Sequence, residues 1–443
     1  MNKPRLDQVT LQAASAKTSD DTSQKWTGEV RYIARQPILN LKGEVHGYRL
    51  LFRDPDPSSS REGDQAARTM LDNAVLFGLD RFTNGLPAFI DCTQETLTSN
   101  MVNVLAPDRS VLVIPASLEP ASNLVKACRE LRKQGYRLAL DDFSGQAKLQ
   151  PIMNLANYLQ INFSEMDDPE RLHLQRIISV STTTLIAKKV ATQEDYRRAS
   201  ASGFTLFQGE YISHPILLKK RKIPANRVFH FKILQELMHV PVDIPQVSKL
   251  VMRDAALTFR LLRLANSPLC AVQQEVRSIE AAILFLGEDT FRRVITVAVL
   301  SELNASKPPE VLHMALQGAR FCEQAAQIFD LEPAEQYLLG LLSMLPALVD
   351  RPMEEVLSSL PLRDPIRGAL QQTMNAERSL LTWLESHERG DWEACDAIVQ
   401  ACPASRGLSA VDAIDRQRQN EQTLNQTYAE SVAWAAATLS QCV

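Results

Sequence analysis

The chain has 443 residues, of which 45% are hydrophobic and 23% charged, with a formal net charge of −4 and a pI near 6.1. This length exceeds one ordinary domain, and the slightly acidic balance argues against a general nucleic-acid-binding protein, which is usually strongly basic. No apolar run reaches the roughly 20 residues of a membrane-spanning helix, so we expect no membrane segment. The seven cysteines are scattered without CxxC spacing, which favours reduced thiols in a cytoplasmic protein over disulfides or a zinc site.

Short apolar runs alternate with helical patterns through the first half of the chain. Residues 1–28 are polar and lack the apolar centre of a secretory signal, so they predict a flexible tail. The runs that follow predict strands over residues 30–39, 86–92, 110–116, 136–142, 157–163, 183–190 and 204–212. The patterns between them predict helices near residues 65–79, 121–133, 169–179 and 193–201. This alternation indicates a mostly parallel sheet covered by helices, and suits a β/α barrel with functional groups at the C-terminal strand ends.

Two adjacent carboxylates end the fourth of these strands, in the stretch "YRLALDDFSG". Asp141 and Asp142 would suit a metal-dependent hydrolase, because carboxylate oxygens are the ligands that hard divalent cations prefer. They are therefore either part of a working catalytic site or the remnant of one.

The second half of the chain is almost continuously helical in pattern. In the stretch "AALTFRLLRLAN", one helical face carries apolar residues at 3.6-residue spacing: Leu257, Leu261, Leu264 and Ala265. The stretch "RSIEAAILFLGEDTFRRVITVAVLSEL" predicts two helices, one from an N-cap at Ser278 to Gly287 and one that begins at Asp289. The second carries an apolar stripe that we assign to the core: Phe291, Val294, Ile295 and Ala298. In "LANSP", a helix is expected to end at Asn266 and Ser267 before Pro268.

A basic run, Lys219–Lys222, separates the two halves. It would suit a phosphate contact or a membrane-surface patch, but a solvated linker explains four charges equally well, and we assign it so.

Several motifs resemble known families. The stretches "ARQPILNLKGEVHGYRLLFRD", "ALDDF" and "LFQGEYISHP" resemble, in order and spacing, the EAL domain of cyclic di-GMP phosphodiesterases. The stretches "VMRDAALTFRLLRLANSPL" and "SIEAAILFLG" resemble the HDOD domain, and "ERGDW" is similar to the C-terminal part of proteins that join the two. The resemblance implies a modified TIM-like (EAL) barrel followed by an all-helical HDOD domain, an α/β plus all-α architecture. We place the EAL domain at residues 29–216, the linker at 217–228, the HDOD domain at 229–420 and a C-terminal helix or tail at 421–443.

EAL hydrolysis uses two divalent metal ions, and the resemblance places their ligands on this chain. The name-giving glutamate falls on Arg49, whose guanidinium has no lone pair to donate. Asp91 falls on a ligand asparagine and could still bind, and with Asp141 and Asp142 it forms the remnant of the metal site. Most other ligand or catalytic positions carry different residues: Val113, Ala116, Gln160, Asn162, Lys188 and Ala191. We expect no Mg²⁺ or Mn²⁺ to bind, and a charge-assisted pair between Arg49 and Asp141 or Asp142 in the metal's place.

Residues at nucleotide-contacting positions of the EAL family are partly retained, namely Gln36, Arg53 and Gln208. The alternative for Arg53 is an ion pair unrelated to a ligand. In the helical half, Ser343 and Met344 stand where HD hydrolases carry their His-Asp pair, as the resemblance to HDOD domains implies. The remaining histidines lack ligand spacing, and we read them as surface or satisfied core residues: His230, His239, His313 and His387.

These features predict a cytoplasmic, non-catalytic signalling protein, whose degenerate EAL domain and HDOD domain act as interaction modules in cyclic di-GMP-related control of motility or surface attachment. The alternatives are a cyclic di-GMP receptor without hydrolysis and a weak phosphodiesterase that uses Asp91, Asp141 and Asp142. The resemblance implies other signalling proteins as partners of the HDOD domain and pairing of two copies through their barrels. We expect no nucleic-acid partner.

Overall fold

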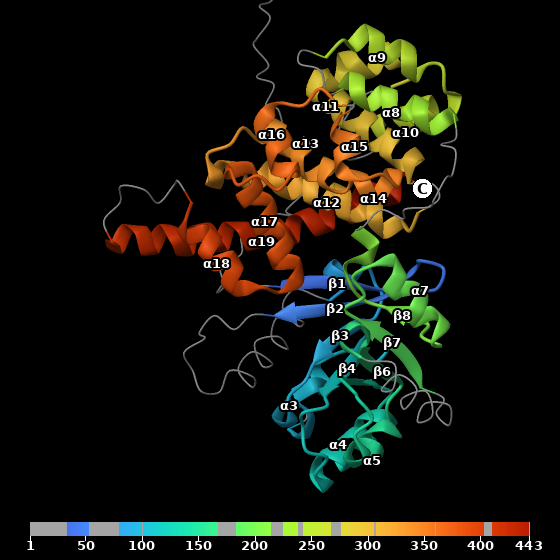
Figure 1. The fold of residues 1–443 in the computed structure, drawn as a ribbon, viewed down its shortest axis with the longest axis vertical. Helices are drawn as coiled ribbons and strands as arrows, with labels where there is room; N and C mark the ends of the chain where they lie inside the picture. The colour runs from blue at the N-terminus through green and yellow to red at the C-terminus, as the bar shows by residue number, and fades with distance from the viewer. Residues whose placement is uncertain are drawn as a thin grey trace, which may run out of the picture. The chain divides into compact units, whose positions relative to one another are not determined.

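The structure is a computed structural model that describes ten parts of the chain (Figure 1): residues 33–52, 79–99, 101–166, 183–213, 225–237, 242–266, 276–304, 307–358, 360–402 and 410–442. The predicted tail, the predicted helix near residues 169–179 and all but the last residue of that near 65–79 lie outside these parts. So do Arg53, Lys219–Lys222 and His239.

The first half of the chain forms a closed barrel of eight strands in sequence order. The strands are β1 (Ile33–Asn40), β2 (Val45–Phe52), β3 (Ala88–Asp91), β4 (Ser110–Pro115), β5 (Arg137–Asp141), β6 (Tyr158–Asn162), β7 (Thr184–Lys188) and β8 (Leu206–Phe207). Strand β1 runs antiparallel to both of its neighbours, β2 and β8, and all other pairs are parallel. The predicted modified TIM-like barrel is confirmed, whereas β2 was not among the predicted strands.

Short helices connect the strands and cover the barrel (Figure 1). They are α2 (Asp80–Thr83), α3 (Gln94–Thr98), α4 (Ser122–Lys133), α5 (Gln150–Met153) and α7 (Gln193–Ala201), with single turns η1 (Met101–Val104), η2 (Ala147–Leu149), η3 (Phe163–Glu165) and η4 (Glu210–Ser213). The predicted helices 121–133 and 193–201 are confirmed. A separate buried cluster, contributed by alternate residues of the strands, fills the barrel interior: Ile38, Phe89, Val111, Val113, Ala139, Tyr158, Ile186 and Leu206.

The second half is all-helical, as predicted. Its helices are α8 (Ala225–Leu237), α9 (Ile244–Val251), α10 (Ala255–Ala265), α11 (Ile279–Leu303), α12 (Pro309–Ala325), α13 (Pro333–Ser343), α14 (Leu345–Val349), α15 (Met353–Ser358), α16 (Asp364–Leu370), α17 (Ala376–Arg389), α18 (Trp392–Gln400) and α19 (Ala410–Cys442), with the turn η6 (Ala326–Phe329). Helix α8 begins inside the predicted linker 217–228, and the boundary expected at residue 421 falls within α19. In the described parts, no helix is long and apolar enough to cross a membrane.

Local sequence signals in the helical half act as expected. The Ser278 hydroxyl accepts a hydrogen bond from the backbone N–H of Ala281 and so caps α11. Gly287 interrupts that helix with a φ of +72°, which confirms the predicted break, while the side chain of Asp289 lies outside the described residues. Asn266 ends α10, and its amide bonds to the backbone of Leu262 and Val276, so its role is structural. Both predicted apolar faces are buried: Leu257, Leu261, Leu264 and Ala265, and Phe291, Val294, Ile295 and Ala298.

A buried polar cluster joins the barrel to helix α12. Arg35, on β1, is only 4% exposed, and its Nη2 lies 2.7 Å from Nδ1 of His313 and 3.5 Å from a carboxylate oxygen of Glu310. The hydroxyl of Tyr48 donates to the other Glu310 oxygen at 2.9 Å, and the Arg35 guanidinium lies over the Tyr48 ring. Burial, reinforced by Arg35, holds the pKa of His313 well below its usual value, so the neutral imidazole can accept a hydrogen bond from Arg35. We call these four residues the Arg35 cluster.

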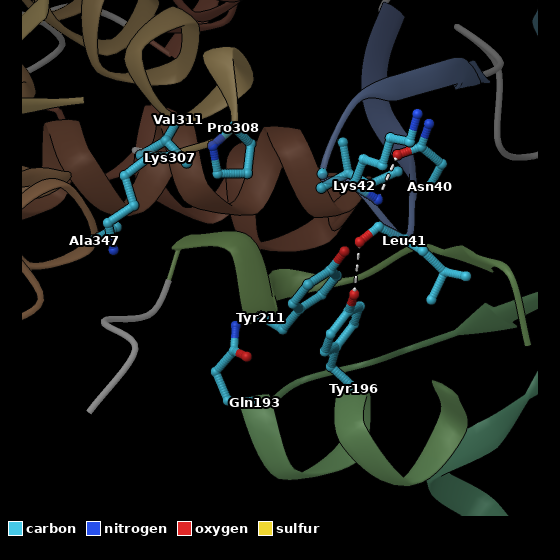
Figure 2. A pocket seen from close by; sticks show the side chains of 12 residues that line it. Asn40, Leu41, Lys42, Gln193, Tyr196, Tyr211, Lys307, Pro308, Val311 and Ala347 are labelled. Carbon is cyan, nitrogen blue, oxygen red and sulfur yellow. Dashed lines mark hydrogen bonds between the residues drawn. The ribbon is translucent and has the colours of Figure 1, made fainter. Parts of the chain in front are cut away.

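A second contact joins the β1–β2 turn to the start of α12. Gly43 adopts a φ of +79°, and a Cβ at this position would lie 2.8 Å from the ring of Pro308, so only glycine fits. A pocket of about 190 Å³ lies beside this contact. Figure 2 shows that two tyrosines of its wall extend toward Leu41, and Tyr196 donates a hydrogen bond to the Leu41 carbonyl at 3.3 Å. The ring of Tyr211 stacks on that of Tyr196.

Replacement of Arg35 by Met tests whether the Arg35 cluster holds the two halves together. Removal of the guanidinium leaves Glu310 buried without its opposite charge, so we expect a loss of about 3–5 kcal/mol in the free energy of unfolding. Urea unfolding followed by tryptophan fluorescence measures it. Arg109→Met is the matched control, because Arg109 pairs with Asp80 on the surface and should contribute less than about 1 kcal/mol. Equal losses of unfolding free energy in the two variants would contradict the assignment. The double variant Arg35→Met/Glu310→Gln should recover part of the unfolding free energy, because its buried residue 310 carries no charge.

Candidate functional site

The C-terminal ends of the parallel strands meet at one mouth of the barrel, where the predicted remnant of the metal site lies. Asp91 is the last residue of β3, Asp141 the last residue of β5 and Lys188 the last residue of β7. Arg49 lies on β2, which is parallel to β3 and therefore points in the same direction. The sequence placed Asp91, Asp141 and Lys188 on separate strands, and closure of the barrel brings them together with Arg49.

Arg49 joins two of the three acids. One of its Nη atoms donates to Oδ1 of Asp91 and to Oδ2 of Asp141, both at 2.8 Å. The other donates to the side-chain oxygen of Gln160 at 3.2 Å. The predicted pairing of Arg49 with the acid pair is thus confirmed for Asp141, while the contacts to Asp91 and Gln160 were not predicted.

Lys188 engages the opposite side of the acid pair. Its Nζ lies 2.5 Å from Oδ1 of Asp141 and 2.9 Å from Oδ1 of Asp142. The backbone at Asp142 has a φ of +49°, a conformation that Asp tolerates better than most residues, and its N–H donates to the Asp141 side chain. This turn places the two carboxylates on either side of one ammonium. Arg49, Lys188, Asp91, Asp141 and Asp142 are called the charge cluster below.

The charge cluster keeps Asp141 ionised. Burial alone would raise the pKa of Asp141, but Arg49 and Lys188 outweigh it and hold the pKa below its usual value. Burial raises the pKa of Asp91, and Arg49 offsets only part of that effect. Burial lowers the pKa of Arg49, but Asp91 and Asp141 raise it by more than burial lowers it. The net pKa is above its usual value, so the guanidinium stays protonated. Two fixed cations thus neutralise most of the charge of three acids.

The remaining positions at which the chain departs from the EAL ligand pattern lie around the charge cluster but add no charged group to it. Val113 is fully buried in the barrel interior, and the backbone N–H of Ala116 donates to the carbonyl of Asp141. Asn162 ends β6 and accepts a hydrogen bond from Ser164, and Ala191 lines the cavity described below. None of these four side chains carries a carboxylate that could hold a divalent cation.

Two of the three predicted nucleotide-contacting residues contact each other. The side-chain amide of Gln208 donates to that of Gln36 at 2.5 Å, and Gln36 in turn donates to the backbone carbonyl of Glu388 in α17 at 3.1 Å. Gly209 follows with a φ of +150°, and a Cβ there would lie 2.2 Å from the carbonyl oxygen of Val190, so the "QG" pair requires glycine. The third residue, Arg53, lies outside the described residues.

A cavity of about 1070 Å³ lies between the barrel mouth and the helical half. From the barrel it is lined by Gln36, Arg49, Lys188 and Gln208, and from the helices by Met314, Leu384, Glu385 and Glu388, among others. Ser343 and Met344, the positions of the missing His-Asp pair, line the same cavity. Burial raises the pKa of Glu388 in this wall to about 7, although Arg35 opposes the shift. The positions that the two resemblances assign to ligands in the barrel and in the helical half therefore face one shared space.

The remaining candidate ligands have structural roles. His230 lies 2.9 Å from a carboxylate oxygen of Asp254, and His387 is fully buried and bonds to Asn425. Both are core residues, as predicted, but they are only half satisfied, because Nδ1 of each ring is buried without a hydrogen-bond partner among the described residues. Within the described parts, no group of three or more His, Cys, Asp or Glu side chains is arranged to hold a metal ion. Among the described side chains, five cysteines are buried and form no disulfide: Cys92, Cys128, Cys322, Cys395 and Cys402.

Sequence reasoning missed the residues that connect the two halves. It did not single out Arg35, Glu310 or Glu388, although an arginine in an otherwise apolar strand pattern is a signal for a buried pair. The stretch "ERGDW" was assigned only to the family resemblance. In the structure, its first three residues, Glu388, Arg389 and Gly390, lie beside the barrel mouth.

Replacement of Arg49 by Met tests the charge cluster. The variant leaves Asp91 and Asp141 with one cation fewer, so we expect a loss of about 3 kcal/mol in the free energy of unfolding at pH 7. The folded-state pKa of Asp141 is depressed, so its contribution is present above about pH 4, the unfolded pKa, and is lost as the pH falls through the folded value. The difference between variant and wild type should therefore shrink below about pH 4. Urea titrations at several pH values measure this, with Lys148→Met, which removes a surface pair, as control. A pH-independent difference would contradict the assignment.

Comparison with known proteins places both halves of the chain. Residues 84–215 match the EAL domain model and residues 223–355 match the HDOD domain model; the EAL match begins after the strand that carries Arg49. The chain is 30% identical over 373 residues to the cyclic di-GMP phosphodiesterase CdgJ of Vibrio cholerae, covering 82% of this chain and 86% of that protein. It is 29% identical over 379 residues to the Bacillus subtilis protein YuxH, and this match covers 83% of this chain and 93% of that protein.

Solved structures similar to the chain include the EAL domain of Mycobacterium smegmatis DcpA. That match has 15% identity and a TM-score of 0.34, and it covers 40% of this chain and 90% of that domain. Along the chain, the EAL domain match precedes the HDOD domain match, and both relatives align with more than 80% of the chain. The chain therefore belongs to the family of proteins in which an EAL domain is followed by an HDOD domain.

Proposed function

We propose that this protein is a non-catalytic component of cyclic di-GMP-related signalling, in which a degenerate EAL domain and an HDOD domain serve as regulatory and protein-interaction modules. Control of motility or surface attachment is the output that the family resemblance implies. The observation that carries the proposal is the charge cluster, in which Arg49 and Lys188 contact the acids at the barrel mouth.

The donor set of the barrel mouth does not suit a two-metal site. Two divalent cations about 3.5–4 Å apart need several carboxylate or amide oxygens that face them. Here Asp141 is contacted on one side by Arg49 and on the other by Lys188, so a metal ion near it would face two fixed positive charges. The surrounding strand ends supply Val113, Ala116 and Ala191 in place of further ligands. The paired cations compensate the remaining acids in the place of a metal.

Catalysis is the competing assignment, because the relative from Vibrio cholerae is named as a cyclic di-GMP phosphodiesterase. A weak phosphodiesterase would depend on Asp91, Asp141 and Asp142. Interaction modules would instead engage other signalling proteins through the HDOD domain, with pairing of two barrels as a further element of the proposal.

Incubation of the purified chain with cyclic di-GMP and Mg²⁺ or Mn²⁺ tests the proposal. We expect no linear dinucleotide above the level of a sample with excess chelator, since the cations of the charge cluster exclude a metal pair. Liquid chromatography of the reaction mixture measures the product. Formation of the linear dinucleotide that Asp142→Ala abolishes, while Asp108→Ala at an exposed site does not, would establish catalysis instead.

A second candidate is a receptor that binds cyclic di-GMP without cleaving it. The large cavity at the barrel mouth favours it, because Gln36 and Gln208 line it. Calorimetric titration with and without Mg²⁺ measures binding. If the cavity is the site, Gln208→Ala should weaken affinity about tenfold, the typical effect of a lost buried hydrogen bond, while Gln150→Ala on the surface should not. Arg53→Ala tests the third family position. Saturable binding whose affinity neither Gln208→Ala nor Arg53→Ala alters would count against this site.

A further inference from the structure

The side chain of Glu388 presents a carboxylate to the cavity between the barrel mouth and the helical half. Glu388 lies near the end of α17, which contacts β1 (Figure 1), and it is half-buried in the cavity wall. One carboxylate oxygen accepts a hydrogen bond from the side-chain amide of Gln317 at 3.1 Å. Within the described parts, the other oxygen forms no hydrogen bond or ion pair, and it remains accessible. The carboxylate is therefore free to accept a hydrogen bond from a ligand in the cavity.

The backbone of Glu388 is bonded to a residue that the receptor candidate assigns to the nucleotide. Its carbonyl accepts a hydrogen bond from the side-chain amide of Gln36 at 3.1 Å, and the amide oxygen of Gln36 accepts one from Gln208. Each of these bonds uses half of the donor or acceptor capacity of Gln36, which keeps one hydrogen and one lone pair for a ligand. A nucleotide held by Gln36 would therefore lie within one side-chain length of the Glu388 carboxylate.

Apolar side chains accompany this carboxylate in the cavity wall. Leu384 lies one helical turn before Glu388 on α17, and Met314 lies one turn before Gln317 on α12. Both side chains line the cavity, as does Leu51 of β2. A flat base packs well against apolar groups of this kind, and a small number of polar groups then decides which base is accepted.

An ionised carboxylate distinguishes the two purine bases. The edge of guanine carries two adjacent donors, N1–H and the N2 amine, whereas the edge of adenine places the acceptor N1 beside its N6 amine, and a carboxylate repels that acceptor. We propose that Glu388 selects the guanine base of cyclic di-GMP in this cavity, as a base-specificity residue supplied by the helical half. The inference rests on the receptor candidate described above and adds to that site a residue from outside the barrel.

Exchange of the base tests the proposal on the full chain. Calorimetric titration at pH 8 with excess chelator should give a wild-type affinity for cyclic di-GMP that is at least about tenfold above that for cyclic di-AMP, because hydrogen bonds to a charged group are strong. The amide of Glu388→Gln offers one donor and one acceptor, which match adenine, so this preference should fall at least about tenfold. Glu354→Gln is the matched control and should keep the preference, because Glu354 is an exposed carboxylate of the same cavity.

The pH dependence of binding provides a second measurement. The charged and titratable groups around Glu388 come from β1, α12, α17 and α19: Arg35, Glu310, Cys322, Glu385, Arg389 and Tyr428. Burial, the largest influence, raises the pKa of Glu388 to about 7. Because only the ionised carboxylate accepts both guanine donors, the affinity for cyclic di-GMP should rise about tenfold from pH 6 to pH 8, and Glu388→Gln should lose this rise.

The outcomes separate this proposal from the receptor function itself. Binding of cyclic di-GMP that Gln208→Ala weakens, while Glu388→Gln alters neither the base preference nor the pH dependence, would overturn the proposal and leave the receptor function intact. Absence of cyclic di-GMP binding to the wild-type chain at pH 8 would overturn both.

Discussion

The contact between the barrel and helix α12 depends on one buried guanidinium. Arg35 leaves the barrel wall at β1 and ends among Glu310 and His313 of α12, and Tyr48 completes the cluster. A buried charge is tolerated only when opposite charge and hydrogen bonds compensate it, so the barrel and the helical domain must stay in contact for Arg35 to be satisfied. Arg35 also donates to the side-chain oxygen of Gln317 in α12, whose amide donates to the Glu388 carboxylate in α17. The end of α17 is thus connected to the barrel through α12.

The acids at the barrel mouth follow the same rule. Loss of metal ligands would leave Asp141 buried and uncompensated, which is costly in a low-dielectric site. Arg49 and Lys188 remove that cost, and both are themselves stabilised by the acids they contact. The result is a group of charged side chains that largely neutralise one another. Ser343 and Met344 line the same cavity from the helical side.

Much of the fold could be predicted from local patterns, and the exceptions have physical causes. Strand β2 was missed because its apolar pattern is interrupted by Gly47 and Arg49, and both residue types are uncommon inside a buried strand. Gly47 is required there, since a Cβ would lie 2.6 Å from the carbonyl of Pro87, and Arg49 finds its partners on β3 and β5. The break at Gly287 and the end of α10 at Asn266 were predictable because glycine geometry and helix capping act over a few residues.

The sequence by itself determined the order of the domains, most strands and helices, and the types of residue that line the barrel mouth. Those features depend on residue identity and short-range periodicity, which a linear reading contains. Only the tertiary structure decided that Lys188 bridges Asp141 and Asp142, that Gln36 and Gln208 bond to each other, and that α17 reaches the barrel mouth. These contacts join residues tens to hundreds of positions apart, and their geometry follows from barrel closure and from the buried Arg35 cluster.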